Sequence, residues 1–467
     1  MPVGEVRDRR GDEDRDAEAC DRAESRRPEA QFVADRDGDD VRDRADDAEL
    51  RDLVNEVPER GVEGAHPVCR HDTQCYRGGH ARLDGVDFRL SDEHEALRKT
   101  VEEFAREVVA PQAAHYDETG EFPYDVIRQM GDIGLFGLPF PEQYGGMGGD
   151  FLALCLAIEE LARADSSVAI TLEAGVGLGS MPIYRFGTEE QKQRWLPSLC
   201  SGAELAAFGL TEPGGGSDAG NPRTRAVLDG DEWVVNGSKA FITNSGTSVT
   251  SLVTVLCRTG ERADGRPELT SVMVPVPHQG FSASKKYSKV GWHASDTREL
   301  VFEDCRVPAE NVLGERGRGY AQFLSTLDEG RIAISALAVG LAQACVDESV
   351  RYAKEREAFG QKIGSYQAVA FRIADMQMRT HVARLAYYDA AARMSAGEPF
   401  KREAAIAKLY SSTIAVDNAR DATQVFGGYG FMNEYPVARH WRDSKILEIG
   451  EGTSEVQRML IARELGL

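Results

Sequence analysis

The order in which helical and strand-like patterns follow one another limits the possible folds of this 467-residue chain most strongly. Over residues 91–206 the apolar side chains recur with the period of an α-helix, beginning at Ser91, a good helix N-cap. Over residues 208–312 the pattern changes to short runs rich in β-branched and aromatic residues. After Gly319 the helical period returns. The sequence therefore predicts a mainly α protein with a central β domain.

A hairpin is expected within the β-rich part. Asn236 and Gly237 lie between β-rich runs at 233–235 and 240–243, and this dipeptide is typical of a two-residue hairpin turn. Further strands are expected over 251–256 and 270–276, and long bundle helices over 332–354 and 366–396.

The first 85 residues differ in composition from the rest. They contain 24 acidic residues and 15 arginines but no lysine, whereas residues 86–467 contain 53 acidic and 40 basic residues. A segment with so few large apolar side chains cannot bury a core, so residues 1–85 are expected to be disordered. We further expect Val86 to be the true start of the protein and the preceding segment to be an extension translated from upstream DNA.

Bulk composition argues against several classes of protein. A formal net charge of −22 argues against nucleic-acid binding. The charged N-terminus argues against a signal peptide, and the lack of an apolar run of about 18 residues argues against a membrane span. We therefore expect a soluble cytoplasmic protein. The eight cysteines have no framework spacing, which favours reduced thiols. Cys69, His71, Cys75 and His80 fit no common zinc spacing, so no metal site is expected.

Two glycine-rich segments could bind a cofactor. Residues 211–218 read TEPGGGSD, and residues 427–430 read GGYG. Backbone N–H groups of such segments can approach an anion closely, although an ordinary connecting loop has the same composition. No G-x-G-x-x-G follows a first strand, so a Rossmann nicotinamide site is poorly supported.

Three other side chains could accompany such a cofactor. Phe241 and Thr243 share one face of a strand, where they could meet a flat ring, although plain strand packing explains them equally well. Arg356, near Phe359 and Gly360, could pair with a phosphate, or could be a solvated arginine at a helix end.

Glu451 stands between Gly450 and Gly452, just before a C-terminal helix that begins with a capping box over 454–457. The ordinary explanation is a carboxylate that interacts favourably with the helix dipole. Alternatively it is a general base, because the flanking glycines leave room for a ligand and apolar neighbours such as Ile449 would raise its pKa. Two backbone cradles and one isolated carboxylate indicate a cofactor plus a base.

Residues 208–218 (FGLTEPGGGSD) and 424–431 (QVFGGYGF), the latter with Glu434, Arg439 and Asp443, resemble the two signatures of the acyl-CoA dehydrogenases. The similarity extends over residues 86–467, and within the family it is closest to the short- and medium-chain, butyryl-CoA dehydrogenase-like members. It implies an FAD-dependent homotetramer, a dimer of dimers with the flavin at a subunit interface. The implied domains are an N-terminal α-helical domain (86–206), a middle β-barrel (207–315) and a C-terminal four-helix bundle (316–467).

The resemblance also implies roles for individual residues. Flavin contacts are implied for Phe208, Leu210, Thr211, Gly216, Ser217, Phe241, Thr243, Thr453 and Glu455. A neighbouring subunit is implied to contribute Arg356, Phe359, Gln424, Gly427 and Gly428 to the adenosine diphosphate half. Substrate contacts are implied for Ser217, Asp328, Arg331, Gly450 and Gly452.

The family places its base either where this chain has Glu451 or on the helix where it has Gly330. Glycine cannot act as a base, and the adjacent Glu329 would point elsewhere on a helix. Glu451 is therefore the expected base. It would remove the α proton of an acyl-CoA as the β hydrogen leaves as hydride to FAD, giving a trans-2-enoyl-CoA, with electrons passed on to an electron-transfer flavoprotein.

Two alternatives on the same fold stay open, an acyl-CoA oxidase and a desulfinase-like relative. A third alternative, from another class, is a catalytically silent protein that binds CoA or flavin. The substrate is suggested by Gly450, where straight-chain members commonly carry tyrosine. A short- to medium-chain acyl group with tolerance for branching is expected, unless Phe241, Phe431 or Leu447 refills the space.

Overall fold

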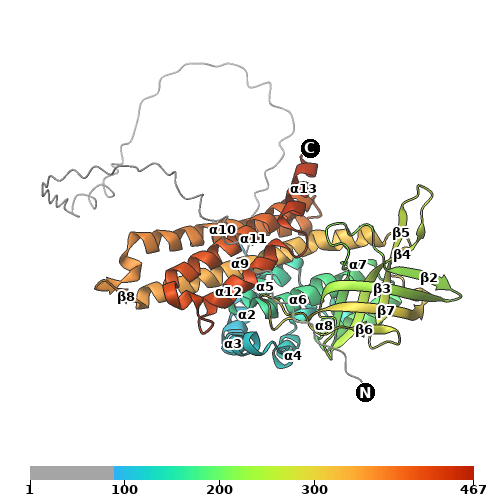
Figure 1. The fold of residues 1–467 in the computed structure, drawn as a ribbon, viewed down its shortest axis with the longest axis horizontal. Coiled ribbons are helices and arrows are strands. Elements are labelled where there is room, and N and C mark those ends of the chain that lie inside the picture. The colour runs from blue at the N-terminus through green and yellow to red at the C-terminus, as the bar shows by residue number, and fades with distance from the viewer. Residues whose placement is uncertain (1–88) are drawn as a thin grey trace, which may run out of the picture. The chain divides into compact units, whose positions relative to one another are not determined.

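The computed structural model describes residues 89–467 (Figure 1). The predictions for residues 1–85, including the cysteine and histidine group and the start at Val86, lie outside the described residues.

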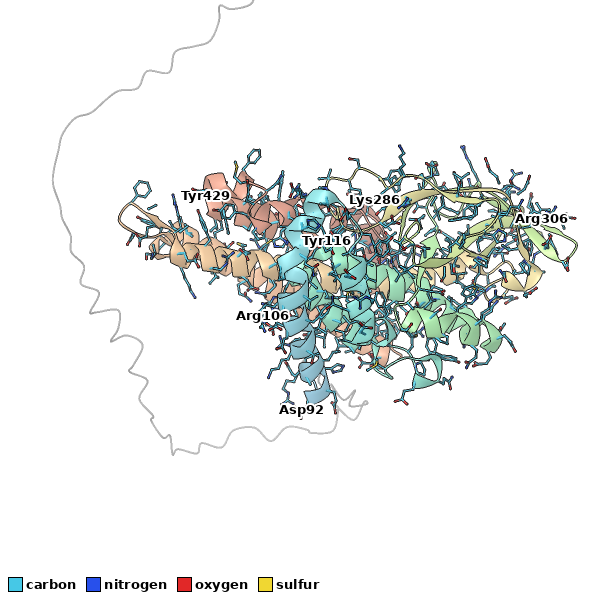
Figure 2. All side chains as sticks on the ribbon, turned by 90° about the horizontal axis from the view of Figure 1, so that it is seen from below. Asp92, Arg106, Tyr116, Lys286, Arg306 and Tyr429 are labelled. Carbon is cyan, nitrogen blue, oxygen red and sulfur yellow. The ribbon has the colours of Figure 1, made fainter. Side chains whose placement is uncertain are left out.

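The N-terminal part is helical. Its α-helices are α2 (Asp92–Phe104), α3 (Ala110–Thr119), α4 (Tyr124–Asp132), α5 (Phe151–Ala164), α6 (Ser166–Glu173), α7 (Met181–Phe186) and α8 (Glu189–Cys200). Short 3-10 turns cover Leu135–Gly137 and Glu142–Tyr144, and wider π-helical turns cover η1 (Ala105–Val109) and η4 (Ala174–Ser180). Ser91 caps α2 by accepting a hydrogen bond from the His94 N–H, at 3.2 Å. Figure 2 shows α2, η1 and α3 as one rod from Asp92 past Arg106 to Tyr116.

A single curled sheet of seven strands forms the middle part. The strands are β1 (Leu205–Gly209), β2 (Arg225–Asp229), β3 (Glu232–Thr243), β4 (Thr250–Glu261), β5 (Pro267–Pro275), β6 (Phe281–Ala283) and β7 (Thr297–Pro308). Their order is β1-β4-β2-β3-β7-β6, and β5 pairs with β4. Trp233, Val255 and Phe302 lie in the apolar core that the sheet encloses.

The predicted hairpin at Asn236 and Gly237 is wrong. Both residues lie inside β3, where the register with β7 shifts between Val235 and Gly237, so the dipeptide forms a β-bulge. A Cβ on Gly237 would lie 2.6 Å from the Thr224 Cα, so glycine is required by a close backbone approach. The antiparallel turn that precedes β3 lies instead at Gly230, whose φ is 67°.

Long helices dominate the C-terminal part. They are α9 (Gly319–Glu355), α10 (Gln367–Ser395), α11 (Lys401–Phe426), α12 (Pro436–Ser444) and α13 (Ser454–Glu464). A small hairpin, β8 (Glu357–Ala358) and β9 (Gln361–Lys362), follows α9, and 3-10 turns cover Ala309–Asn311, Ile363–Ser365, η7 (Gly427–Phe431) and η8 (Lys445–Glu448). α9, α10 and α11 pack side by side, with α5 against α9 (Figure 1). The fold agrees with the three-part architecture predicted from the sequence.

α9 is the one helix of residues 89–467 that is long and apolar enough to cross a membrane. However, 83% of its most apolar stretch is buried inside the protein. This burial is typical of a core helix.

Candidate active site

Glu451 lies in a strained turn between η8 and α13. Its φ is 53°, in the left-handed region, and that of the following Gly452 is 97°. A left-handed conformation costs a residue with a side chain about 1–2 kcal/mol, so the surrounding structure has to enforce it. Gln457 Nε2 donates to the carbonyls of Glu451 and Gly452, at 3.3 and 3.0 Å. Lys408 Nζ donates to the Gly452 carbonyl at 2.7 Å.

The turn directs the Glu451 side chain towards α9. A Cβ placed on Gly330 would lie 2.5 Å from Glu451 Oε2 and 3.4 Å from Leu178 Cδ2. The two positions considered for the base, 330 and 451, therefore converge on one point in space. Glycine at position 330 leaves room for the carboxylate that arrives from position 451.

A second carboxylate, Glu173 at the end of α6, faces Glu451. The side-chain oxygens of both residues are buried and, with both groups ionised, accept no hydrogen bond from any residue in 89–467. Burial raises the pKa of Glu451, and burial together with the charge of Glu451 raises the pKa of Glu173 well above its usual range. A proton held by Glu173 and donated to Glu451 removes the repulsion between the two carboxylates and joins them by a hydrogen bond. Lys408 and Arg331 favour the ionised form of Glu451.

Burial raises the pKa of Glu451 as expected, but the neighbour named for it is wrong. Ile449 is 50% exposed and does not enclose the carboxylate. The sequence reasoning also missed Glu173 and Lys408. The available signal was a single charged residue in a run of small and apolar ones, VAITLEAGVGL over 168–178 and AAIAKL over 404–409.

Two expected substrate-side residues lie on α9 near Glu451. Asp328 and Arg331 are buried and form an ion pair, and Lys401 Nζ lies 3.3 Å from Asp328 Oδ2. Glu329 turns away, as predicted, and its Oε1 lies 3.0 Å from an Arg185 guanidinium nitrogen.

The first glycine-rich segment is anchored by a buried ion pair. Glu212 Oε1 lies 2.8 Å from Lys239 Nζ on β3, and the Glu212 carboxylate also accepts hydrogen bonds from the N–H groups of Arg223 and Thr224, at 2.7 and 3.0 Å. Lys239 donates further to the Leu210 carbonyl at 3.2 Å. Gly216 and Ser217, at the tip of the segment, stay exposed.

Phe241 lies next to this segment, and Thr243 is two residues further along, at the end of β3. The N–H of Ala240 donates to the Thr211 carbonyl at 2.8 Å, which joins β3 to the loop. Phe241 is 66% exposed, has a φ of 61°, and its ring centre lies 5.4 Å from that of Tyr287. An exposed aromatic ring beside open glycines fits a planar flavin ring stacked at this place.

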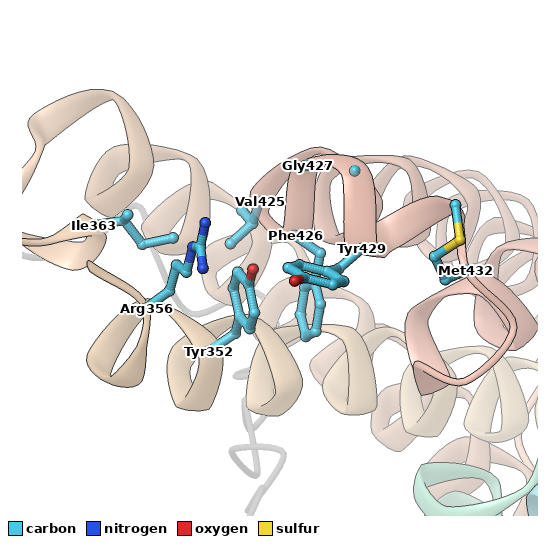
Figure 3. Close-up of a pocket in the computed structure, with 9 residues that line it drawn as sticks. Tyr352, Arg356, Ile363, Val425, Phe426, Gly427, Tyr429 and Met432 are labelled. Atoms are coloured by element: carbon cyan, nitrogen blue, oxygen red, sulfur yellow. The ribbon is translucent and has the colours of Figure 1, made fainter. Parts of the chain in front are cut away.

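The second glycine-rich segment borders a groove of about 540 Å³ (Figure 3). Its lining residues are Tyr352, Arg356, Ile363, Val425, Phe426, Gly427, Gly428, Tyr429 and Met432. A Cβ on Gly427 or Gly428 would meet nothing within 4 Å, and the Arg356 guanidinium lies 5.8 Å from the centre of the Tyr429 ring. Open glycines beside an arginine fit a phosphate. Gln424 and Phe359, also expected here, are exposed but do not line the groove.

One chain does not bring all the predicted flavin residues together. Phe208 stacks on Phe323 near the start of α9, with ring centres 4.0 Å apart, whereas Arg356 follows the end of α9. At 1.5 Å per residue these points are about 50 Å apart, which exceeds the reach of one FAD molecule. Thr453 caps α13 by accepting from the Val456 N–H, at 3.3 Å, and Glu455 is exposed in the first turn, both close to Glu451 in sequence.

Profiles of known protein domains match the three parts of the chain. Profiles described as acyl-CoA dehydrogenase N-terminal, middle and C-terminal domains match residues 91–203, 207–305 and 317–466. A probable acyl-CoA dehydrogenase of Bacillus subtilis, YngJ, is 48% identical over 380 residues, which cover 81% of this chain and all of that protein.

Solved structures of related proteins match the fold of this chain. Butyryl-CoA dehydrogenase from Megasphaera elsdenii is 42% identical, with a TM-score of 0.79 over 82% of this chain and all of that one. A chain from a structure described as the electron transferring flavoprotein of Acidaminococcus fermentans is 41% identical, with a TM-score of 0.79 over 81% of this chain and 99% of that one.

These matches confirm the resemblance drawn from the two glycine-rich segments, and with it the predicted enzyme class, a flavin-dependent oxidoreductase whose cofactor is FAD. The chain belongs to the acyl-CoA dehydrogenase family.

Proposed function

We propose that this protein oxidises short- to medium-chain acyl-CoA thioesters, including branched ones, to trans-2-enoyl-CoA, with Glu451 as the base. The observation that carries the proposal is the buried Glu451 carboxylate, which a strained turn directs into the space left by Gly330. FAD supplies the acceptor for the hydride that leaves the β carbon.

The protein residues have separate tasks in this proposal. Glu451 takes the α proton, and its raised pKa makes it a stronger base than an exposed carboxylate. Its backbone N–H would donate to the thioester carbonyl and stabilise the enolate-like charge that develops there. The buried helices around the carboxylates keep water from the reacting carbons.

Glu451→Gln tests the base. It is expected to retain FAD but to lower kcat by about 10²–10⁴-fold, the usual contribution of a positioned base. Glu329→Gln is the matched control, because the neighbouring Glu329 pairs with Arg185 and faces away from the base. Anaerobic bleaching of the flavin bands by butyryl-CoA measures both variants. Near-normal bleaching in Glu451→Gln would remove this residue from the mechanism.

The space at Gly450 supports a branched substrate. Apart from its chain neighbours, only Ile446 lies within 4 Å of a Cβ placed on Gly450, at 3.5 Å. Of the three side chains that could refill this space, Phe241 and Phe431 are exposed and Leu447 is buried, and none reaches that Cβ within 4 Å.

Gly450→Tyr tests the substrate. The added ring should lower kcat/KM for isobutyryl- or 2-methylbutyryl-CoA by about tenfold or more while butyryl-CoA is affected less, because it overfills the branch space. Equal losses on branched and straight substrates would show that position 450 does not select the acyl group.

We also propose that a neighbouring subunit completes the flavin site and that an electron-transfer flavoprotein is the acceptor. The separation of the two sets of flavin residues along α9 supports the first point. Reoxidation by molecular oxygen distinguishes the oxidase alternative: rapid hydrogen peroxide formation by the reduced enzyme would favour an oxidase.

A further inference from the structure

We propose that Lys408 on α11 is a positioning residue for the catalytic base, holding the turn that presents Glu451 and keeping a positive charge beside its carboxylate. The inference rests on the proposed role of Glu451 and adds to it a residue that acts through the base. Lys408 is fully buried, and an unpaired ammonium group in such a place would be strongly destabilising.

The hydrogen bond of Lys408 stabilises the turn that carries Glu451. Its Nζ lies 2.7 Å from the carbonyl oxygen of Gly452, the residue directly after Glu451. The left-handed φ values of Glu451 and Gly452 turn this carbonyl towards α11, so the lysine stabilises the conformation in which the carboxylate faces Gly330. The hydrogen-bond partner of Lys408 Nζ within residues 89–467 is this uncharged carbonyl, so the charge of the lysine is balanced at longer range.

That longer-range balance includes the base itself. The groups that act on Lys408 are Glu451 and Glu448, Glu455 from the start of α13, and Arg331 from α9. Glu451 is in turn affected by Glu173, Lys408 and Arg331. Burial lowers the pKa of Lys408 to about 8, so the lysine carries its charge at neutral pH and favours the ionised, proton-accepting form of Glu451.

Gln457 provides a control within the same turn. Its Nε2 donates to the carbonyls of Glu451 and Gly452, as Lys408 does to the latter, but it is neutral. Replacing either residue should disturb the geometry of the turn. Only replacement of the lysine should also change the proton affinity of Glu451.

The experiment compares Lys408→Met with Gln457→Leu in the FAD-loaded enzyme. With butyryl-CoA and an artificial acceptor, both variants should lower kcat by about 10- to 100-fold, because the base is displaced. Only Lys408→Met should also move the acid limb of the kcat/KM profile to higher pH, by about 1 unit, because a neighbouring positive charge is lost. Lys408→Arg, which keeps the charge and a donor, should return the limb towards its original position.

A second readout isolates proton transfer from flavin reduction. With the flavin chemically reduced beforehand, exchange of the butyryl-CoA α proton into heavy water, followed by mass spectrometry, should slow in Lys408→Met and recover in Lys408→Arg. An unchanged acid limb or an unchanged rate of exchange in Lys408→Met would overturn the inference. Loss of FAD in Lys408→Met and in the shorter Lys408→Gln would also overturn it, by assigning the lysine to folding.

The proposed base is tested separately. If Glu451→Gln is inactive while Lys408→Met keeps the original acid limb, the base stands and the lysine inference fails. If Glu451→Gln exchanges the α proton normally, the proposed function fails whatever Lys408 does.

Discussion

At the scale of single residues, the space beside Gly330 governs the candidate site, because the Glu451 carboxylate fills it. Gly330→Ala would place a carbon 2.5 Å from Glu451 Oε2, and the carboxylate would have to move. We expect FAD to be retained and kcat to fall by about tenfold or more, since a small displacement of a catalytic group is costly.

The control is Gly450→Ala, at the residue directly before the base. The nearest atom to its added Cβ, the Ile446 carbonyl oxygen, is at 3.5 Å, an ordinary contact. Stopped-flow reduction of the flavin by butyryl-CoA compares the two variants. Equal rates in both would mean that the free space beside Gly330 is not used by the base.

Glu173 gives a prediction about pH. As the proton-holding partner, it stabilises ionised Glu451, so Glu173→Leu removes a donor and should raise the pKa of the base. The acid limb of kcat/KM should then move to higher pH, whereas Glu173→Gln, which keeps an amide donor, should move it less. A limb that stays in place in Glu173→Leu would contradict the shared proton.

Sequence reasoning reached part of this residue-level picture. Glu451 could be identified because two glycines flank it, and glycines in a sequence indicate where the backbone can adopt unusual conformations. Glu173 and Lys408 could not be assigned to the site in the same way, because their roles depend on α6 and α11 meeting the turn in space. A lone charge in an apolar helix signals burial, but not which group it faces.

At the scale of elements, the first glycine-rich segment depends on β3 beneath it. Glu212 and Lys239 are both at least 91% buried as side chains, so their ion pair fixes the base of the loop. Lys239→Met should destabilise the protein by about 3–5 kcal/mol, because it leaves a buried carboxylate without its partner. It should also weaken FAD retention, because the loop loses its anchor.

Thermal unfolding and the flavin content after gel filtration test this prediction. The double variant Glu212→Met with Lys239→Met should recover part of the stability, because no charge is then left unpaired. A single variant as stable as the unaltered protein would show that the pair does not hold the loop.

Element prediction failed where local and long-range preferences differ. Asn236 and Gly237 have the composition of a turn, but pairing with β7 carries β3 straight through them as a bulge. The helix prediction was more accurate, because helical periodicity is local: α10 spans Gln367–Ser395 where 366–396 was expected, although α9 begins at Gly319 and not at residue 332. Strand pairing, in contrast, joins distant segments.

At the scale of the whole molecule, the two sets of flavin residues predict complementation between chains. Arg356→Ala should lose FAD and assembly together, whereas Arg420→Ala, an exposed arginine paired with Asp417, should retain both. Sedimentation and flavin absorbance measure the two properties. Retention of both in Arg356→Ala would argue that each chain holds its own cofactor.

Mixed assemblies sharpen this test. A Glu451→Gln chain and an Arg356→Ala chain, each impaired alone, should regain activity when co-expressed, since one of the two sites in a mixed pair combines an intact base with an intact arginine. No recovery would contradict a shared site.

The length of α9 also has a consequence for electron transfer. If each site combines the start of one α9 with the end of its partner's, two sites in a pair lie roughly one helix length, about 50 Å, apart. Electron tunnelling decays over a small fraction of such a distance. In such a pair each reduced flavin would discharge to its own external acceptor, and the helix that builds the proposed shared site would also insulate one redox centre from the other.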